Sequence, residues 1–256
     1  MMLGGAYDAA QAWALPVYFS KVTDPVYTFD CVGGRKHVAV HIPKKAAPLS
    51  GNDGALVIVD RATDQMVSLF EATSPQESAS GTWEASNCSR YYLSSNGINE
   101  LAVHGTAGNF GHRGVPDWTR VVTVKEVRSG RINRRLACTW EGTRTAHYWP
   151  MVRPERRKGI VPEGTVLRIK PSANLDDLVP NAHARVVARA LQKYGCVIGD
   201  NGGNTLTRLE RNERGWRKLG VSKDALRSLP WQYWEFVRGG YDPTDGLTHR
   251  PAGGSG

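Results

Sequence analysis

The sequence predicts an all-β protein, an antiparallel β-sandwich of the jelly-roll-like type with one packed α-helix near residues 181–194. Three observations support this prediction. Short apolar runs recur along the chain, Gly, Pro, Asn and Ser separate them, and no series of long helices alternates with them. With 256 residues the chain is long enough to bury a sizeable hydrophobic core.

Two runs carry the clearest strand signals. HVAVHIP (37–43) alternates apolar and polar residues, which predicts one buried and one exposed face. ALVIVD (55–60) is apolar almost throughout, which predicts a strand covered on both sides. Further strands are expected, in chain order, in QMVSLFEA, GTWEAS, SRYYLSS, TRVVTVKEV, RRLACTWEG, TAHYWP, TVLRIKP, GCVIGD, NTLTRLE and YWEFV.

One helix is well signalled, in PNAHARVVARALQKYG (180–195). Asn181 is a good N-cap residue, Val187 and Leu191 share one face, and Gly195 permits a left-handed exit. A more weakly signalled helical turn is expected in SKDALRSLP (222–230). The longer helix should pack against a sheet.

We expect a single β-sandwich domain over residues 35–240. An N-terminal extension (1–34) should pack on it, and a C-terminal tail and linker (241–256) should follow it. No internal repeat is visible, and no apolar stretch approaches the roughly 18 residues that a membrane span needs. Membrane insertion is therefore not expected.

The formal net charge of +9 favours an anionic partner such as nucleic acid, acidic polysaccharide or an anionic cell envelope. The densest basic stretches are RSGRINRR (128–135) and RPERRKG (153–159). Charged strand edges and loops are the ordinary explanation of such stretches. Charge by itself does not choose among the partners, and nucleic acid, which only the charge supports, is not the expected one.

The four cysteines are Cys31, Cys88, Cys138 and Cys196, and none of them forms a CxxC pair. Zinc-finger spacing is therefore missing, and we expect no metal and no cofactor. Cys138 and Cys196 lie in apolar strand-like runs, where a reduced cysteine behaves as a small hydrophobic residue. The disulfide pairing and the redox compartment stay open.

Polar residues converge in YGCVIGDNGGN (194–204), where an apolar run ends in Asp200, Asn201 and Asn204. Asx side chains readily bond neighbouring backbone amides, so a turn is the first interpretation and a site the second. Asp60, Glu84 and Glu141 also lie in or at the ends of expected strands. Turn or rim hydrogen bonds are the favoured interpretation of these carboxylates. Two carboxylates on one sheet face can also divide into acid and base, and if the protein is a glycoside hydrolase we expect Asp200 and Glu84 in those catalytic roles.

The glycine-rich stretch HGTAGNFGHRGVPDW (104–118) is either a binding loop or a plain surface loop. It supplies His104 as a further catalytic candidate and Arg113 as a substrate-binding one. His37 and His41 do not form a metal site on a strand, since four residues span about 13 Å there.

Aromatic residues on the expected strands suggest stacking on sugar rings, although for each individual ring a place in the hydrophobic core is the favoured interpretation. The rings in question belong to Trp83, Tyr91, Tyr92, Trp140, His147, Tyr148 and Trp149. The complete set of expected substrate-binding residues is Trp83, Asn201, Asn204, His147, Trp149, Arg113 and Asp60.

Four stretches resemble an uncharacterised family of secreted β-sandwich proteins from soil bacteria and actinobacteria. They are GTWEASNCSRYYLSSNG, VVTVKEVRSGRINRRLACTW, GTVLRIKPSANLDDL and ARVVARALQKYGCVIGDNGGN. The family pattern reads LRLKPS, then ALQKYG, then ADNG, and the similarity covers roughly residues 35–240. The resemblance implies the sandwich fold and an association with cell-wall or polysaccharide-active proteins.

The chain departs from this pattern in two places. It has DGA (53–55) where the family usually has DGH, and Arg134 and Arg135 where the family has a His-Ala pair. Asp60 and the DNG run (200–202) are retained. If the family histidines are functional, these losses favour a non-catalytic protein or a site rearranged around His104, His112 or His147.

The leading interpretation is an extracellular polysaccharide-binding protein, with cleavage by glycoside hydrolase or polysaccharide lyase chemistry left open. The alternative is a non-catalytic structural or adhesion module of a cell-surface or phage-tail assembly. Both interpretations place the protein outside the cell or on a cell or virion surface, although no signal peptide is visible in the sequence. The oligomeric state is left open.

Overall fold

The computed structural model describes residues 1–9, 14–30, 37–50, 53–94, 115, 120–149, 151, 155 and 158–237. Of these residues 38% lie in strands and 18% in helices, which confirms a mostly-β protein. The chain forms two compact units. Unit 1 comprises Met1–Ala14 and Trp118–Tyr241, and unit 2 comprises Leu15–Asp117 and Asp242–Gly256. The domain limits expected from the sequence (1–34, 35–240 and 241–256) stay a prediction, which this division by itself does not test.

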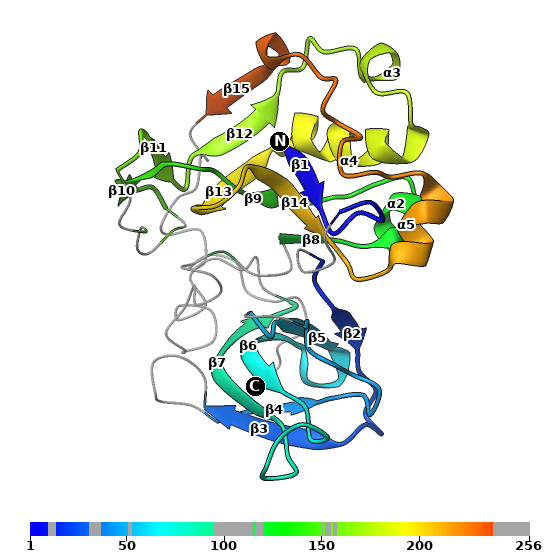
Figure 1. Ribbon diagram of the computed structural model, residues 1–256, viewed down its shortest axis with the longest axis vertical. Helices are drawn as coiled ribbons and strands as arrows, with labels where there is room; N and C mark the ends of the chain where they lie inside the picture. The colour runs from blue at the N-terminus through cyan, green and yellow to red at the C-terminus, as the bar shows by residue number, and fades with distance from the viewer. Residues whose placement is uncertain are drawn as a thin grey trace. The chain divides into compact units, whose positions relative to one another are not determined.

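Unit 2 contains a four-stranded sheet and a two-stranded hairpin (Figure 1). The sheet has the order β2-β5-β6-β7 and is antiparallel except for the parallel pair β2 and β5. The strands of unit 2 are β2 (Val17–Phe19), β3 (Val26–Asp30), β4 (His37–His41), β5 (Leu56–Asp60), β6 (Gln65–Thr73) and β7 (Glu84–Tyr92).

The core of unit 2 lies between the hairpin and the sheet. Val38 and Val40 of β4 share one buried cluster with Ile58 of β5 and Leu69 of β6. The alternation expected for β4 is therefore confirmed, and all five residues of β5 are buried, as its apolar run predicted. Cys88 lies in the same cluster and is disulfide-bonded. Its bond crosslinks the chain at the core of this unit.

Unit 1 combines small sheets with helices (Figure 1). Its sheets have the orders β15-β12-β13-β9, β1-β14-β8 and β10-β11. Its strands are β1 (Met2–Gly4), β8 (Val121–Val122), β9 (Leu136–Thr139), β10 (Thr143–His147), β11 (Val161–Glu163), β12 (Val166–Ile169), β13 (Cys196–Asp200), β14 (Thr205–Leu209) and β15 (Trp234–Val237). Its helices are α2 (Val124–Arg128), α3 (Leu175–Leu178), α4 (Ala182–Lys193) and α5 (Glu213–Leu219).

The packed helix expected near 181–194 is confirmed as α4. The Asn181 side chain accepts a hydrogen bond from the Ala184 amide at 2.8 Å, which caps the helix start. Val187 and Leu191 are fully buried in the core of unit 1, and α4 contacts β12. Gly195 follows the helix with φ +73°, so the glycine supplies the left-handed exit.

The sheets are small and mixed, whereas the sequence analysis expected antiparallel strands throughout. β13 runs parallel to β9, and β14 runs parallel to both β1 and β8. These pairs join segments far apart in the chain, and long connections allow parallel pairing where short hairpins do not. A jelly-roll-like sandwich is not confirmed.

The expected strand TRVVTVKEV (119–127) is partly wrong, because α2 begins inside it at Val124. Thr123 and Glu126 form a capping box, in which each side chain accepts a hydrogen bond from the other residue's backbone amide. Val124 and Val127 are buried on the inner side of this short helix. The expected helical turn after Ser222 is present only as hydrogen-bonded turns.

Candidate functional site

β13 ends at Asp200, whose carboxylate pairs with a residue that the sequence analysis did not single out. The Arg120 guanidinium donates a hydrogen bond from Nη2 to Asp200 Oδ2 at 3.1 Å. The two side chains are only 12% and 18% exposed. A pair this sheltered from water is screened less than an exposed one, so it holds the Asp200 carboxylate firmly in place.

Asn201 and Asn204 are held by the turn that follows β9. Asn201 Oδ1 accepts hydrogen bonds from the backbone amides of Gly142 and Thr143, both at 3.1 Å. Asn204 has φ +38°, and its Oδ1 accepts a hydrogen bond from the Glu141 amide at 3.0 Å. Both side chains therefore connect the exit of β13 to the turn after β9. The sequence analysis expected local bonds to neighbouring amides, whereas these bonds reach amides about 60 residues away in the chain.

An aromatic cluster, formed by Trp140, Trp231, Trp234 and Phe236, lies in the same unit. The Trp140 ring meets the Trp231 and Phe236 rings edge to face, with centroid distances of 6.3 Å and 5.2 Å. Trp231 and Trp234 are tilted against each other at 6.1 Å. Trp231 is 59% exposed and Phe236 48% exposed, whereas Trp234 is buried. The cluster thus presents two rings to solvent on a packed base.

The backbone connects the aromatic cluster to Asp200. Trp140 directly follows β9, and its amide donates a hydrogen bond to the Asp200 carbonyl oxygen at 3.1 Å. A pocket adjoins the cluster, because Trp231 and Trp234 are among the residues that line it. It is lined by Met1, Leu226, Arg227, Leu229, Trp231 and Trp234, and we call it the Trp231 pocket. The polar exit of β13, the rings and the pocket all belong to unit 1.

The expected catalytic partner Glu84 lies in unit 2, at the start of β7. Its exposed carboxylate accepts hydrogen bonds from Ser80 Oγ at 2.5 Å and Ser78 Oγ at 2.7 Å. These bonds, the stronger effect coming from Ser80, hold the pKa of Glu84 below its ordinary value. Glu84 and Asp200 belong to different units, so their pairing as acid and base stays a prediction.

Asp60 is fully buried and belongs to a polar cluster inside unit 2. Its Oδ2 lies 2.8 Å from His41 Nδ1 and accepts a hydrogen bond from the His41 amide at 3.0 Å, while its Oδ1 accepts one from the Ala62 amide at 3.1 Å. Burial alone would raise the pKa of Asp60, but these bonds with His41 and one from Thr63 hold it below the ordinary aspartate value. These contacts join Asp60 to residues of its own unit, as is usual for a structural carboxylate.

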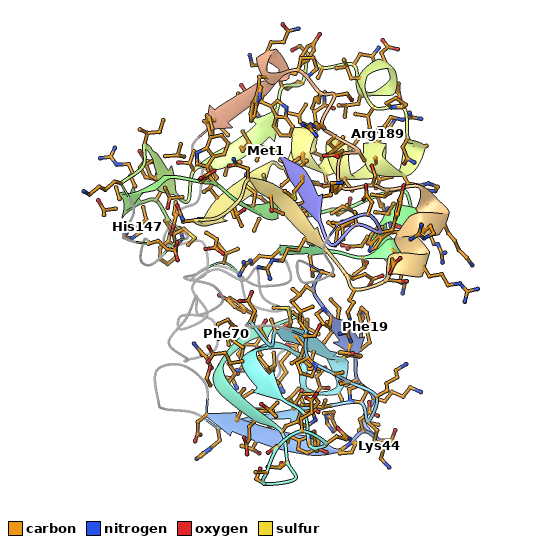
Figure 2. The ribbon with its side chains drawn as sticks, viewed as in Figure 1. Met1, Phe19, Lys44, Phe70, His147 and Arg189 are labelled. Carbon is orange, nitrogen blue, oxygen red and sulfur yellow. The ribbon has the colours of Figure 1, made fainter. Side chains whose placement is uncertain are left out.

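The other expected residues are scattered. Trp83 is buried in the core of unit 2 and presents no platform. His147 is exposed at the end of β10 (Figure 2). Trp149, two residues later, is half-buried. His104 and Arg113 lie outside the described residues.

Sequence reasoning missed Arg120, Arg227, Trp231 and Phe236. The density of rings in PWQYWEF (230–236) was a usable signal for the last two, because three aromatic residues precede Phe236 within six positions. No local signal marks Arg120 as the partner of Asp200, since the pair forms only when the chain folds.

Within the described ranges, no group of three or more His, Cys, Asp or Glu side chains is arranged to hold a metal ion. Among the same residues, no helix has the length and apolar character to span a membrane. Comparison with protein-family models, with curated proteins and with solved structures finds nothing that matches this chain.

Proposed function

We propose that the protein binds an extracellular polysaccharide and that the aromatic cluster of unit 1 is the binding surface. The observation that carries this proposal is the exposure of Trp231 and Phe236 on a base formed by Trp140 and Trp234. Large rings are costly to leave in water, and a cluster of them on a surface marks a ligand or partner site.

Flat rings suit sugars because the C–H groups on one face of a pyranose pack against an aromatic face while its hydroxyls stay hydrogen-bonded at the edges. The contacts with Trp140 restrict the rotamers of Trp231 and Phe236. Less side-chain entropy is then lost when a ligand binds.

An extracellular or cell-surface location is part of the proposal. The disulfide at Cys88 supports it, because disulfides persist in oxidising compartments and are rare in the cytosol. We also propose that the chain is a jelly-roll-like sandwich and that it is related to the family it resembles. The packing of the β3–β4 hairpin on the sheet of unit 2 supports a two-layer β arrangement for that unit alone.

Cleavage of the polysaccharide would require a general acid and a second carboxylate or base at the bond. Asp200 is connected to the aromatic cluster by the hydrogen bond from the Trp140 amide to its carbonyl oxygen. In a hydrolase, Asp200→Asn should abolish depolymerisation while binding persists. Full retained activity would remove Asp200 from any catalytic role.

The alternative, a non-catalytic structural or adhesion module, is favoured by the ion pair between Arg120 and Asp200. In this pair the Asp200 carboxylate accepts a hydrogen bond from a sheltered side chain of its own unit, as a structural carboxylate does. Tight glycan binding without reducing ends or unsaturated products would favour this alternative. Products in the same assay would exclude it.

Binding is tested with a glycan array followed by mass spectrometry of the products. Phe236→Ala and Trp231→Ala should lower the affinity for the bound glycan about tenfold or more, since each removes a stacking ring. Phe70→Ala is a matched control, because Phe70 is a 43% exposed phenylalanine on β6 of unit 2 (Figure 2). Equal binding by Phe236→Ala, Trp231→Ala and the Phe70 control would refute the proposed surface.

A further inference from the structure

The positive charge of the chain is concentrated in the unit that carries the aromatic cluster. By sequence, unit 1 has 24 Lys and Arg against 12 Asp and Glu, a net charge of +12. Unit 2 has 9 against 12, a net charge of −3, and the two together give the +9 of the whole chain. An anionic ligand is therefore attracted to unit 1 and not to the protein at large.

One basic side chain lines the Trp231 pocket itself. Arg227 is 75% exposed, and its Nη1 lies 3.7 Å from Asp224 Oδ1, beyond hydrogen-bonding distance. Arg168 lies on β12, beside the strand that carries Trp234. Unlike Arg227, it is already engaged, because its guanidinium donates hydrogen bonds to Glu235 at 2.6 and 2.9 Å. Since no described residue accepts a hydrogen bond from the Arg227 guanidinium, its donors are available for a ligand beside the Trp231 ring.

We propose that the polysaccharide is acidic and that Arg227 binds the carboxylate of a uronic acid residue whose ring stacks on Trp231. This inference rests on the proposed function and adds the substrate class and one specificity residue. The fork of the guanidinium matches the two oxygens of a carboxylate, and such charge-assisted pairs are stronger than bonds to hydroxyl groups.

The pocket favours a uronate over a nucleic acid strand. Its remaining lining residues are apolar or aromatic, with Met1, Leu226 and Leu229 beside the tryptophans. A single guanidinium next to a ring fits one carboxylate on one sugar. Nucleic acid binding depends instead on several cations that neutralise successive phosphates along a strand.

The test measures binding affinity by isothermal titration calorimetry at fixed ionic strength. The three uronate ligands are oligosaccharides of galacturonate, alginate and hyaluronate. The comparison ligands are the methyl ester of oligogalacturonate and a single-stranded oligothymidylate. We expect at least one of the three uronate oligosaccharides to bind, and methyl esterification to weaken the binding of oligogalacturonate if that is the ligand. Arg227→Gln should lower the affinity for the bound uronate about tenfold. The control Arg189→Gln removes the same charge from an exposed arginine of α4 that does not line the pocket, and should change the affinity less than twofold.

Equal losses for Arg227→Gln and Arg189→Gln would overturn the inference, because the effect would then be one of overall charge. If the protein binds only neutral glycans, and Trp231→Ala still weakens that binding, the inference is overturned while the proposed function stands. Binding of the oligothymidylate in preference to every uronate would overturn it in favour of nucleic acid. No binding to any glycan would refute the proposed function as well.

Discussion

The ring of Trp140 meets the ring of Phe236 edge to face, with centroids 5.2 Å apart and planes at 85°. Phe236 lies in β15, and Trp140 directly follows β9. These two strands are the outer strands of one sheet, in the order β15-β12-β13-β9. Trp140 also contacts Trp231 and so is the shared base of both exposed rings.

The contacts of Trp140 predict a measurable loss of stability in Trp140→Leu. Each aromatic pair contributes about 0.5–1.5 kcal/mol beyond its buried area, so the loss of two pairs should lower the free energy of unfolding by about 1–3 kcal/mol. Urea titration followed by far-UV circular dichroism measures this change. Tyr148→Leu is the control, because Tyr148 is exposed and outside the cluster. An unchanged unfolding midpoint in Trp140→Leu would show that the ring contacts contribute nothing.

The pair between Arg120 and Asp200 should matter more for stability than an exposed pair in the same unit. Asp200→Asn removes the negative charge from a sheltered ion pair, which should cost about 1–3 kcal/mol. The control is Glu213→Gln, whose partner Arg217 lies 2.7 Å away on the surface of α5. That variant should lose less than about 0.5 kcal/mol, because water screens exposed ion pairs. Equal losses in chemical denaturation would contradict this prediction.

The lowered pKa of Asp60 predicts that the free energy of unfolding of unit 2 falls in acid. Its pKa is lower in the folded protein than in the unfolded chain, so folding favours the ionised form. This stabilisation is fully present above the ordinary aspartate pKa of about 3.9 and is lost as the pH falls through the lower folded value. Urea unfolding at a series of pH values below 5 should show the decline in the wild type and a shallower decline in Asp60→Asn. Parallel pH profiles for the two proteins would count against the prediction.

Alanine substitutions at Gly195 and Gly130 should distinguish the cost of backbone strain from the cost of a steric clash. Both have positive φ, +73° and +77°. A Cβ at Gly195 would lie 2.5 Å from Val166 Cγ1 and 2.9 Å from the Leu167 carbonyl oxygen, whereas a Cβ at Gly130 has no neighbour within 4 Å among the described residues. Gly130→Ala should cost about 1 kcal/mol through strain, and Gly195→Ala about 2–4 kcal/mol because β12 must also shift. Thermal unfolding of the two variants gives the comparison, and similar melting temperatures would refute it.

Local patterns predicted local structure well. Asn181, Gly195 and the apolar positions between them specify α4, because capping and helical period depend only on neighbours in the chain. The alternation in β4 and the apolar run in β5 were informative for the same reason. The strand expected across Val124 was wrong because its β-branched residues were given more weight than the capping box at Thr123.

The candidate site was predicted only in part. Asp200, Asn201 and Asn204 were correctly placed at the exit of an apolar strand, since the pattern of residues around them is local. Period-two spacing cannot say which face of a strand another layer covers, so Trp83 was expected on a surface and is buried in the core of unit 2.

The sequence by itself determined the secondary structure of most segments, the capped helix, the polar turn after β13 and the excess of positive charge. Tertiary structure decided the parallel pairing of β9 with β13, the partnership of Arg120 with Asp200 and the gathering of Trp140, Trp231 and Phe236 into one surface. The physical reason is that propensity, period and capping act between near neighbours in the chain. Strand order and ring contacts instead depend on which distant segments bury their apolar faces against each other.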